Sequence, residues 1–323
     1  SAIGAGLLAL GLFAGMFLPR FSTTPAISVP VSAAEPLAVL PANSGSIWSV
    51  SFDPTSDMLA MAVEDGTVRV WDWPKKTIQE TLDAHRGTVW VSKFSPDGKL
   101  LATAGDDGLL KIWNRSKQEP LKIFERPNAV RGLAFGNEER LFAGDRGGGL
   151  HVWSMDASEP LLTAQQPGAV YAVALSADGK TLASAGSEKT IRLWNADTLT
   201  QRLPLEGHAG PVYGLSFNPG GDRLASAGWD GTIRIWDPSI GKLLHSWKGQ
   251  SGDIWSVAFS PKSGNLATGG TDGSVRIWNP STGKLLATYL GHKTTVHSIA
   301  FNGDGSLLAS GGRDGAVRIW KVD

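Results

Sequence analysis

A tryptophan recurs at nearly constant spacing along most of this chain. Successive members of the series are 40 to 42 residues apart, at Trp71, Trp113, Trp153, Trp194, Trp236, Trp278 and Trp320. A short run of strand-forming residues, such as TVRV or TIRI, precedes each of them. A fixed period of this length is typical of folds that stack copies of one supersecondary unit. We therefore expect seven copies of one unit.

Each unit also carries the signals of four antiparallel strands. Six residues before each tryptophan stands a turn residue, and in five of the seven units it is aspartate followed by glycine, the strongest hairpin dipeptide. Runs such as IWSVAF and LLATAG precede the turn, and runs such as KLLATY follow the tryptophan. Four strands in about 42 residues match one blade of a β-propeller. We expect an all-β, seven-bladed β-propeller over residues 36–323.

The motifs at the two ends of these units resemble those of the WD-repeat family. Glycine-histidine pairs stand near the start of units and tryptophan-aspartate pairs near their ends, as in Gly207-His208, Gly291-His292, Trp71-Asp72 and Trp236-Asp237. Other units end in Trp-Asn or Trp-Ser. The resemblance covers residues 36–323 and implies a ring of seven four-stranded sheets around a central channel.

The two ends of the repeat region predict how the ring closes. Only three residues follow Trp320, so the last blade lacks its outer strand. Residues 36–41, with the sequence PLAVLP, precede the first inner strand and match the missing one. We expect residues 37–40 to pair with residues 317–320, which would remove two exposed sheet edges.

An apolar run stands before the repeats. Residues 1–19 carry no charge, and as a helix rising ~1.5 Å per residue they would reach roughly 28 Å, close to the ~30 Å of a hydrocarbon core. We expect a single transmembrane helix, followed by an extended linker over residues 20–35. A signal peptide is the alternative, because residues 31–34 (VSAA) are small. Gly11 and Gly15 form a GxxxG step suited to helix packing, although glycine is common in membrane helices generally.

The charge around this run says little about orientation. Arg20 is the only basic residue that flanks it, so the positive-inside rule does not predict the orientation of the helix. An apolar run at the start of a chain more often directs the export of the domain behind it. We expect the propeller on the extracytoplasmic or lumenal side of the membrane.

The composition argues against several classes of function. The 30 lysines and arginines balance 30 aspartates and glutamates, which removes the electrostatic reason to expect a nucleic-acid partner. The absence of cysteine excludes thiolate nucleophiles, disulfides and zinc–thiolate sites. No HExxH or GxSxG motif occurs. We expect no catalytic residues, no cofactor and no metal.

Three units combine histidine, serine or threonine, aspartate and tryptophan, a set that looks like a catalytic triad on paper. The family resemblance implies instead a buried hydrogen-bond chain in each blade, because the aspartate closes a tight turn and the buried indole N–H needs a partner. The three sets are His85, Thr103, Asp107 and Trp113; His208, Ser226, Asp230 and Trp236; and His292, Ser310, Asp314 and Trp320. Gln166 and Gln250 take the histidine position in two further blades. Asn43 and Arg126 take it in blades 1 and 3, which we expect to be the loosest.

Two positions supply candidate partner-binding residues. The first follows the first aliphatic residue of each inner strand, which the resemblance places near the channel mouth, and carries Trp48, Trp90, Arg131, Tyr171, Tyr213, Trp255 and His297. The second precedes the turn residue and carries Glu64, Asp106, Arg146, Ser187, Trp229, Thr271 and Arg313. Clustered Trp, Tyr and Arg are the residue types that dominate binding energies. Packing between blades is the alternative for the first set, because Trp48 shares strand parity with Val50 and Phe52. Trp229 is the better candidate, since it stands where other repeats carry polar residues.

Blade 3 departs from the pattern. It reads Gly147-Gly148-Gly149 where most units read Asp-Gly, and it gathers Arg126, Arg131 and Arg146. If these arginines reach one face, they would receive an acidic segment of a partner. A degenerate blade with solvated arginines is the alternative.

Together these features predict a non-catalytic, membrane-anchored scaffold that docks proteins within a larger membrane complex. A transient assembly factor for such a complex is one alternative. From a different class, a small-molecule sensor or an enzyme that uses the channel mouth as its pocket remains open.

Overall fold

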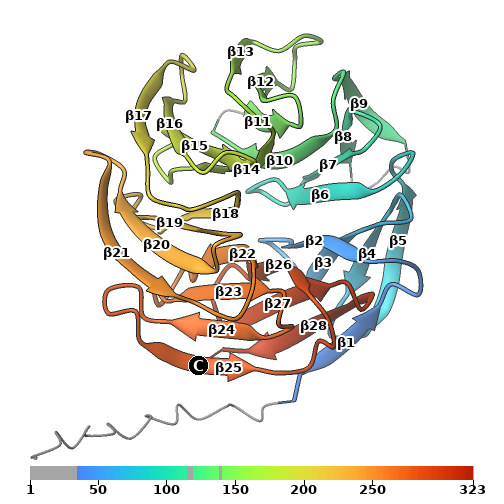
Figure 1. Ribbon diagram of the computed structural model, residues 1–323. Helices are drawn as coiled ribbons and strands as arrows, with labels where there is room; N and C mark the ends of the chain where they lie inside the picture. Colours follow the sequence, from blue (N-terminus) through green and yellow to red (C-terminus); the bar gives the residue numbers. More distant parts are fainter. Residues whose placement is uncertain (1–34, 115–118, 138–139, 323) are drawn as a thin grey trace, which may run out of the picture.

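A computed structural model describes residues 35–114, 119–137 and 140–322 of the chain, and these form seven four-stranded antiparallel sheets around a central axis (Figure 1). Blade 1 consists of β2 (Ile47–Phe52), β3 (Met58–Val63), β4 (Thr67–Asp72) and β5 (Thr77–Asp83). Blade 2 consists of β6 (Val89–Phe94), β7 (Leu100–Gly105), β8 (Leu109–Asn114) and β9 (Pro120–Glu125). Blade 3 consists of β10 (Val130–Phe135), β11 (Arg140–Asp145), β12 (Gly149–Ser154) and β13 (Leu162–Gln165).

The same order, from the inner strand to the outer one, continues in the remaining blades. Blade 4 consists of β14 (Val170–Leu175), β15 (Thr181–Gly186), β16 (Ile191–Asn195) and β17 (Gln201–Leu205). Blade 5 consists of β18 (Val212–Phe217), β19 (Leu224–Gly228), β20 (Thr232–Asp237) and β21 (Lys242–Lys248). Blade 6 consists of β22 (Ile254–Phe259), β23 (Leu266–Gly270), β24 (Val275–Trp278) and β25 (Leu285–Tyr289). Blade 7 consists of β26 (Val296–Phe301), β27 (Leu307–Gly312), β28 (Ala316–Lys321) and, as its outer strand, β1 (Ala38–Pro41).

Strand β1 closes the ring by pairing with the opposite end of the chain. It runs antiparallel to β28, with Ala38 opposite Ile319 and Leu40 opposite Val317. The N–H of Leu37 extends the pairing by donating to the carbonyl of Ile319 at 2.7 Å. This is the pairing expected from the two ends of the repeat region, and it gives blade 7 its fourth strand.

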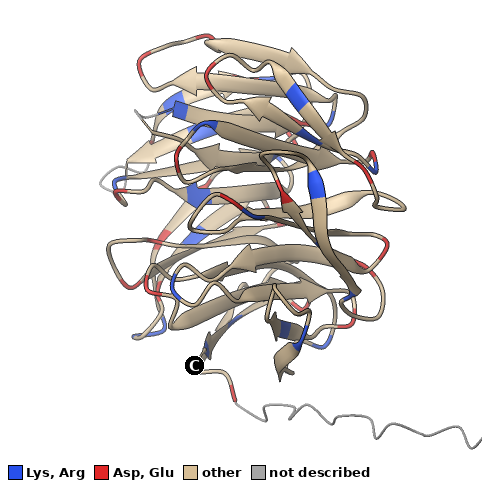
Figure 2. Ribbon diagram, turned by 90° about the vertical axis from the view of Figure 1, so that its left-hand side faces the viewer, with Lys and Arg blue, Asp and Glu red and all other residues tan. Residues whose placement is uncertain are grey.

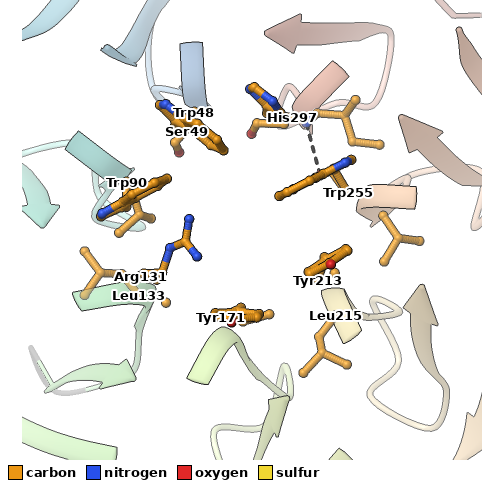
Figure 3. Close-up of a pocket in the computed structure, with 18 of the residues that line it drawn as sticks. Trp48, Ser49, Trp90, Arg131, Leu133, Tyr171, Tyr213, Leu215, Trp255 and His297 are labelled. Atoms are coloured by element: carbon orange, nitrogen blue, oxygen red, sulfur yellow. Dashed lines mark hydrogen bonds between the residues drawn. The ribbon is translucent and has the colours of Figure 1, made fainter. Parts of the chain in front are cut away.

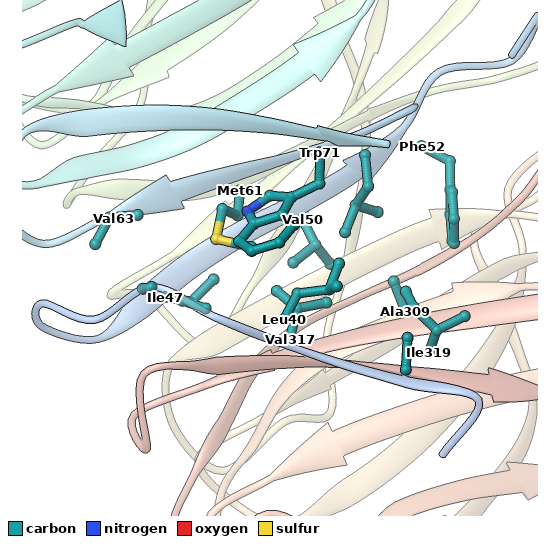
Figure 4. Close-up of a cluster of buried hydrophobic side chains, with 13 residues drawn as sticks. Leu40, Ile47, Val50, Phe52, Met61, Val63, Trp71, Ala309, Val317 and Ile319 are labelled. Atoms are coloured by element: carbon teal, nitrogen blue, oxygen red, sulfur yellow. The ribbon is translucent and has the colours of Figure 1, made fainter. Parts of the chain in front are cut away.

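The hydrophobic core is divided among the seven seams between neighbouring blades. Seven clusters of buried side chains occupy these seams, each drawing on two adjacent blades. In the seam between blades 7 and 1, Trp71 and Met61 pack with Leu40, Val317 and Ile319 (Figure 4). Both faces of a middle strand are therefore covered, so β3 is buried at five of its six residues, whereas the outer strand β5 is mostly exposed.

Serine hydroxyl groups join the inner strands of neighbouring blades. Backbone N–H groups of three inner strands donate to a serine Oγ of the preceding blade: Phe94 to Ser51 at 3.3 Å, Phe259 to Ser216 at 3.1 Å and Ile299 to Ser256 at 3.1 Å. Val50 donates in the same way to Ser298 across the closing seam, at 3.1 Å. These bonds satisfy backbone donors at the inner edges of four of the sheets, where no further strand follows.

The predicted hydrogen-bond chain is present in the three blades that carry the full residue set. In blade 5 the indole N–H of Trp236 donates to Ser226 Oγ at 2.8 Å, and Ser226 Oγ lies 2.8 Å from His208 Nε2. His208 Nδ1 lies 3.0 Å from the Asp230 carboxylate. Burial lowers the pKa of His208, so the ring is neutral and every donor in the chain has an acceptor. The same contacts, at 2.7–2.9 Å, link Trp113, Thr103, His85 and Asp107 and also Trp320, Ser310, His292 and Asp314.

Blades 1 and 3 depart from this chain in different ways. In blade 1, Met61 replaces the serine or threonine, and the buried Trp71 Nε1 has no hydrogen-bond partner among the described residues. In blade 3 the missing turn aspartate is replaced by Asp145, two residues earlier, whose carboxylate lies 2.9 Å from His151 Nε2. Asp145 also accepts from the backbone N–H of Gly147 at 2.7 Å. Blade 3 thus has a relocated carboxylate, but the buried His151 Nδ1 accepts or donates no hydrogen bond within the described residues. That blades 1 and 3 are the loosest stays a prediction.

The predicted membrane helix over residues 1–19, with Gly11 and Gly15, lies outside the described residues, as does the linker over residues 20–35 except Glu35. Within the described ranges, no helix has the length and apolar character needed to span a bilayer.

The closing strand supplies a stability prediction. Leu40 is fully buried in the closing seam, whereas Leu37, on the same strand segment, is 47% exposed. We expect Leu40→Ala to reduce the free energy of unfolding by about 2–5 kcal/mol, because it removes buried methyl groups and leaves a cavity. Leu37→Ala is the matched control and should cost less than about 1 kcal/mol. Chemical denaturation of the two variants measures this, and equal losses would contradict the closure.

Asp314 gives a prediction on acid stability. Burial alone would raise its pKa, but hydrogen bonds and charge from His292 and Arg318 outweigh that and lower the pKa to about 2. A carboxylate with a lowered pKa contributes stability above its unfolded pKa of about 3.9, and this contribution is lost as the pH falls towards 2. Asp314→Asn should therefore lower the melting temperature at pH 7, and the difference from wild type should shrink between about pH 4 and pH 2.

Thermal melts across this pH range measure the effect. Asp83→Asn, at an exposed position on β5, is the control and should leave the melting temperature nearly unchanged throughout. A difference for Asp314→Asn that stays constant down to pH 2 would show that the charge of Asp314 does not stabilise the blade.

Candidate functional site

One side chain from each inner strand reaches the same mouth of the central channel (Figure 3). We call this set the mouth ring; its members are Trp48, Trp90, Arg131, Tyr171, Tyr213, Trp255 and His297. They are the residues that the sequence predicts for the first partner-binding position, and they surround a cavity of about 300 Å³.

A β-bulge in every inner strand aims these side chains at the channel. In blade 2, Val89 is paired with Gly105 and Val91 with Ala104, so Trp90 between them has no opposite residue. In each of the other six blades the pairing register shifts in the same way, and the mouth-ring residue is again left without an opposite residue. A bulge reorients the extra side chain and interrupts the alternation of the strand. The parity argument for packing at Trp48 therefore does not hold, because a bulge separates Trp48 from Val50.

The mouth ring is continuous from blade to blade. Trp48 stacks on His297 with ring centroids 4.0 Å apart, and Tyr213 stacks on Trp255 at 4.5 Å. Trp48 also meets Trp90 edge to face at 4.6 Å. Tyr171 and Tyr213 are 6.0 Å apart and Trp255 and His297 5.4 Å apart. Aromatic pairs of this kind contribute about 0.5–1.5 kcal/mol each beyond their burial, so the mouth is ordered before any partner arrives.

Arg131 completes the mouth ring between two aromatic neighbours. Its guanidinium carbon lies 3.7 Å from the centroid of Trp90 and 5.0 Å from that of Tyr171. Burial lowers the pKa of Arg131 to about 10, with a further lowering from Arg146, so the side chain remains cationic at neutral pH. Trp90 is also held on its polar side, where Nε1 donates to Asp106 at 2.6 Å.

The members of the mouth ring differ in exposure. His297 is 8% exposed, and its Nδ1 lies 3.1 Å from the carbonyl oxygen of Ile47. Burial lowers the pKa of His297, which leaves the ring neutral and able to donate to that carbonyl. The other six members are half-buried. His297 is thus a packing residue of the closing seam, while its neighbours present partly open surfaces.

A second set of residues surrounds the mouth ring, and we call it the outer ring. In all seven blades its backbone N–H donates, at 2.9 or 3.0 Å, to the carbonyl just before the inner strand. Its members are Glu64, Asp106, Arg146, Ser187, Trp229, Thr271 and Arg313, all exposed except the half-buried Ser187. Positive and negative side chains thus share this rim. In the side view of the ribbon, positions of Lys and Arg are likewise interspersed with positions of Asp and Glu (Figure 2).

Trp229 is the most exposed aromatic residue of the two rings, with 54% of its surface accessible. Its backbone N–H donates to Pro211, and its ring lies over Gly210, where a β-carbon would approach within 2.6 Å. The absence of a side chain at Gly210 therefore lets the indole lie flat beside the strand that carries Tyr213.

The three arginines of blade 3 differ in the contacts that they make. Arg131 and Arg146 influence each other electrostatically at the mouth. Arg126 instead lies over Trp153 of its own blade, with the guanidinium carbon 5.8 Å from the ring centroid. Arg126 occupies the histidine position and lies over the blade tryptophan. That the three arginines together receive an acidic segment of a partner stays a prediction.

Lys93 is a channel residue that the sequence reasoning missed. It lies on β6 and lines the cavity beneath the mouth ring. Burial lowers the pKa of its ammonium group. The sequence could have indicated Lys93, because the equivalent residues of the other six inner strands are all serine or alanine.

The described residues contain no group of three or more histidine, aspartate or glutamate side chains arranged to hold a metal ion. The hydroxyl groups that look catalytic on paper are also inaccessible, since Ser226 and Ser310 are fully buried. The mouth of the channel is therefore the main candidate for function.

Comparison with known proteins agrees with this architecture. The family model described as "WD domain, G-beta repeat" matches residues 34–72, 76–114, 158–195, 199–237, 241–279 and 283–321. The longest gap between these matches, residues 115–157, holds most of blade 3, where the aspartate is relocated. No curated protein matches the chain at a significant level.

Proposed function

Because the chain belongs to the WD-domain, G-beta-repeat family, we propose that it is a non-catalytic docking subunit that binds a protein partner at the mouth of its channel. Propellers of this family are typical protein-interaction scaffolds. The proposed contact surface consists of the mouth ring and the outer ring, with residues 1–19 anchoring the propeller to a membrane.

The observation that carries this proposal is the β-bulge repeated in all seven inner strands. A bulge interrupts strand pairing, and here each one turns a side chain towards the mouth. Five of the seven side chains are Trp or Tyr and one is Arg, which are the types that most often dominate protein interfaces. Their stacking holds the surface ordered, so little conformational entropy is lost on binding.

Docking accounts for the surface better than catalysis does. Each histidine of the three complete chains has both ring nitrogens engaged in the blade. The neighbouring hydroxyl groups are buried and cannot meet a substrate. A transient assembly factor would use the same mouth, and the lifetime of the complex distinguishes that role from a permanent one.

The membrane anchor rests on the sequence. Residues 1–19 are apolar, uncharged and close to the length of a bilayer core. An anchored propeller would lie close to neighbouring membrane proteins, which favours a partner within a membrane complex.

The proposal is tested by co-purification of the full-length protein from native membranes in mild detergent. We expect a triple variant, Trp229→Ala with Arg146→Ala and Arg313→Ala, to lose its partner, because these exposed residues contribute to the mouth without filling the core. Trp229 alone should contribute about 2 kcal/mol or more to binding. Ile240→Ala, at a 65% exposed site on the turn between β20 and β21, is the control and should keep the partner.

A further variant separates the mouth from the anchor. It replaces residues 1–19 by an unrelated membrane-spanning sequence and keeps the propeller unchanged. Retention of the partner would support docking at the mouth. Loss of the partner here, with retention in the triple variant, would contradict docking at the mouth and assign binding to the anchor.

A further inference from the structure

Lys93 differs from the small residues at the equivalent positions in the wall of the channel. It stands next to the last residue of its inner strand, where the other six blades carry Ser51, Ala134, Ala174, Ser216, Ala258 and Ala300. Small side chains at this position leave the channel open, whereas Lys93 places a four-carbon chain and a positive charge in it. Nothing in the packing of a blade calls for a cation here, since six blades do without one.

Lys93 lies at mid-depth in the channel. It lines the cavity of about 300 Å³ beneath the mouth ring and also a cavity of about 440 Å³ that opens among the turns at the other end of the inner strands. Leu133 and Leu215 are shared by both cavities in the same way. Lys93 is therefore part of the wall that a molecule entering the channel would contact.

The charge of Lys93 is not neutralised within the described part of the chain. No hydrogen bond or ion pair joins Lys93 to another described residue, and no aspartate or glutamate is among the residues that line the upper cavity. Burial is the sole cause of its lowered pKa, with no carboxylate acting in the opposite direction. An unpaired charge in a partly desolvated channel is costly, and such groups normally have a partner.

Arg131 brings a second cation to the same cavity. Figure 3 shows its guanidinium directed inwards from the mouth ring, above the channel. It is held by the faces of Trp90 and Tyr171 and makes no hydrogen bond to any described residue. Its N–H donors are therefore available to an acceptor that enters the mouth.

We propose that the channel beneath the mouth ring is a binding site for a small oxyanion, a molecule whose carboxylate or phosphate group is contacted by Lys93 and Arg131. An ammonium and a planar guanidinium are the side-chain groups that best bind such anions. The size of the cavity, at the lower end of the ~300–1,000 Å³ range of ligand pockets, fits a small molecule. The contact between Trp48 and Trp255, with centroids 6.1 Å apart, narrows one side of the entrance further. The site shares Arg131 with the proposed docking surface, but its binding of an oxyanion does not require a protein partner.

The site is tested with the purified full-length protein in mild detergent and without any partner. Inorganic phosphate and succinate are titrated separately by calorimetry and by thermal melts, with chloride added to hold the ionic strength constant. We expect at least one of the two probes to bind saturably and to raise the melting temperature. Binding of phosphate alone, succinate alone or both identifies the oxyanion class, and each of these results supports the site.

Variants then assign the binding to the two cations. Lys93→Met keeps most of the length of the side chain without its charge and should weaken binding by tenfold or more. The melting temperature without ligand should stay the same or rise, because an unpaired charge is removed. Arg131→Gln should weaken binding as well, and Lys93→Arg should retain most of it. Lys284→Met removes a charge at an exposed turn of blade 6 and should bind like wild type.

Two results would overturn the proposal. One is the absence of saturable binding of either probe to the wild-type protein. The other is an equal affinity of wild type and Lys93→Met, which would place any bound anion outside the channel. Neither result bears on protein docking, which is measured separately with the outer-ring variants.

Discussion

The whole architecture depends on the pairing of β1 with β28. This pairing joins residues that are about 280 positions apart in sequence and gives the last blade its outer strand. Each blade buries its faces only against its two neighbours, so an open ring would leave two blades with a bare face. The mouth depends on the same closure, because Trp48 of blade 1 stacks on His297 of blade 7 across the closing seam.

Much of the fold could be predicted because its signals are local and repeated. The tryptophan period, the turn residues and the spare strand at residues 37–40 together predict the number of blades and the closure. The hydrogen-bond chains could be predicted as well, since they need particular residue types at fixed positions. The contact between Asp145 and His151 was not predicted, because Asp145 stands two residues before the position of the turn aspartate in other blades. Only its short distance to the imidazole shows that it takes the place of that aspartate.

The orientation of the candidate site could not be predicted from residue types. The mouth-ring position carries tryptophan, tyrosine, arginine and histidine, and none of these marks a β-bulge. The bulge is a property of the strand register, which the pairings of Val89 and Val91 show and the side chains do not. If the strand alternated strictly, Trp48 would lie on the same face as Val50 and Phe52, and packing between blades would be the reasonable interpretation. The sequence shows that Lys93 stands where the other blades carry serine or alanine. Only the structure shows that this lysine lines a cavity, where its charge could bind a ligand.

The central claim is that the mouth of the channel faces another protein. Photo-crosslinking in native membranes tests it most directly, with a photoreactive phenylalanine analogue in place of Trp229 or, as the control, of Ile240. Our account predicts a specific crosslinked protein from position 229 and none from position 240. The same crosslinked protein from position 240, or none from position 229, would contradict it.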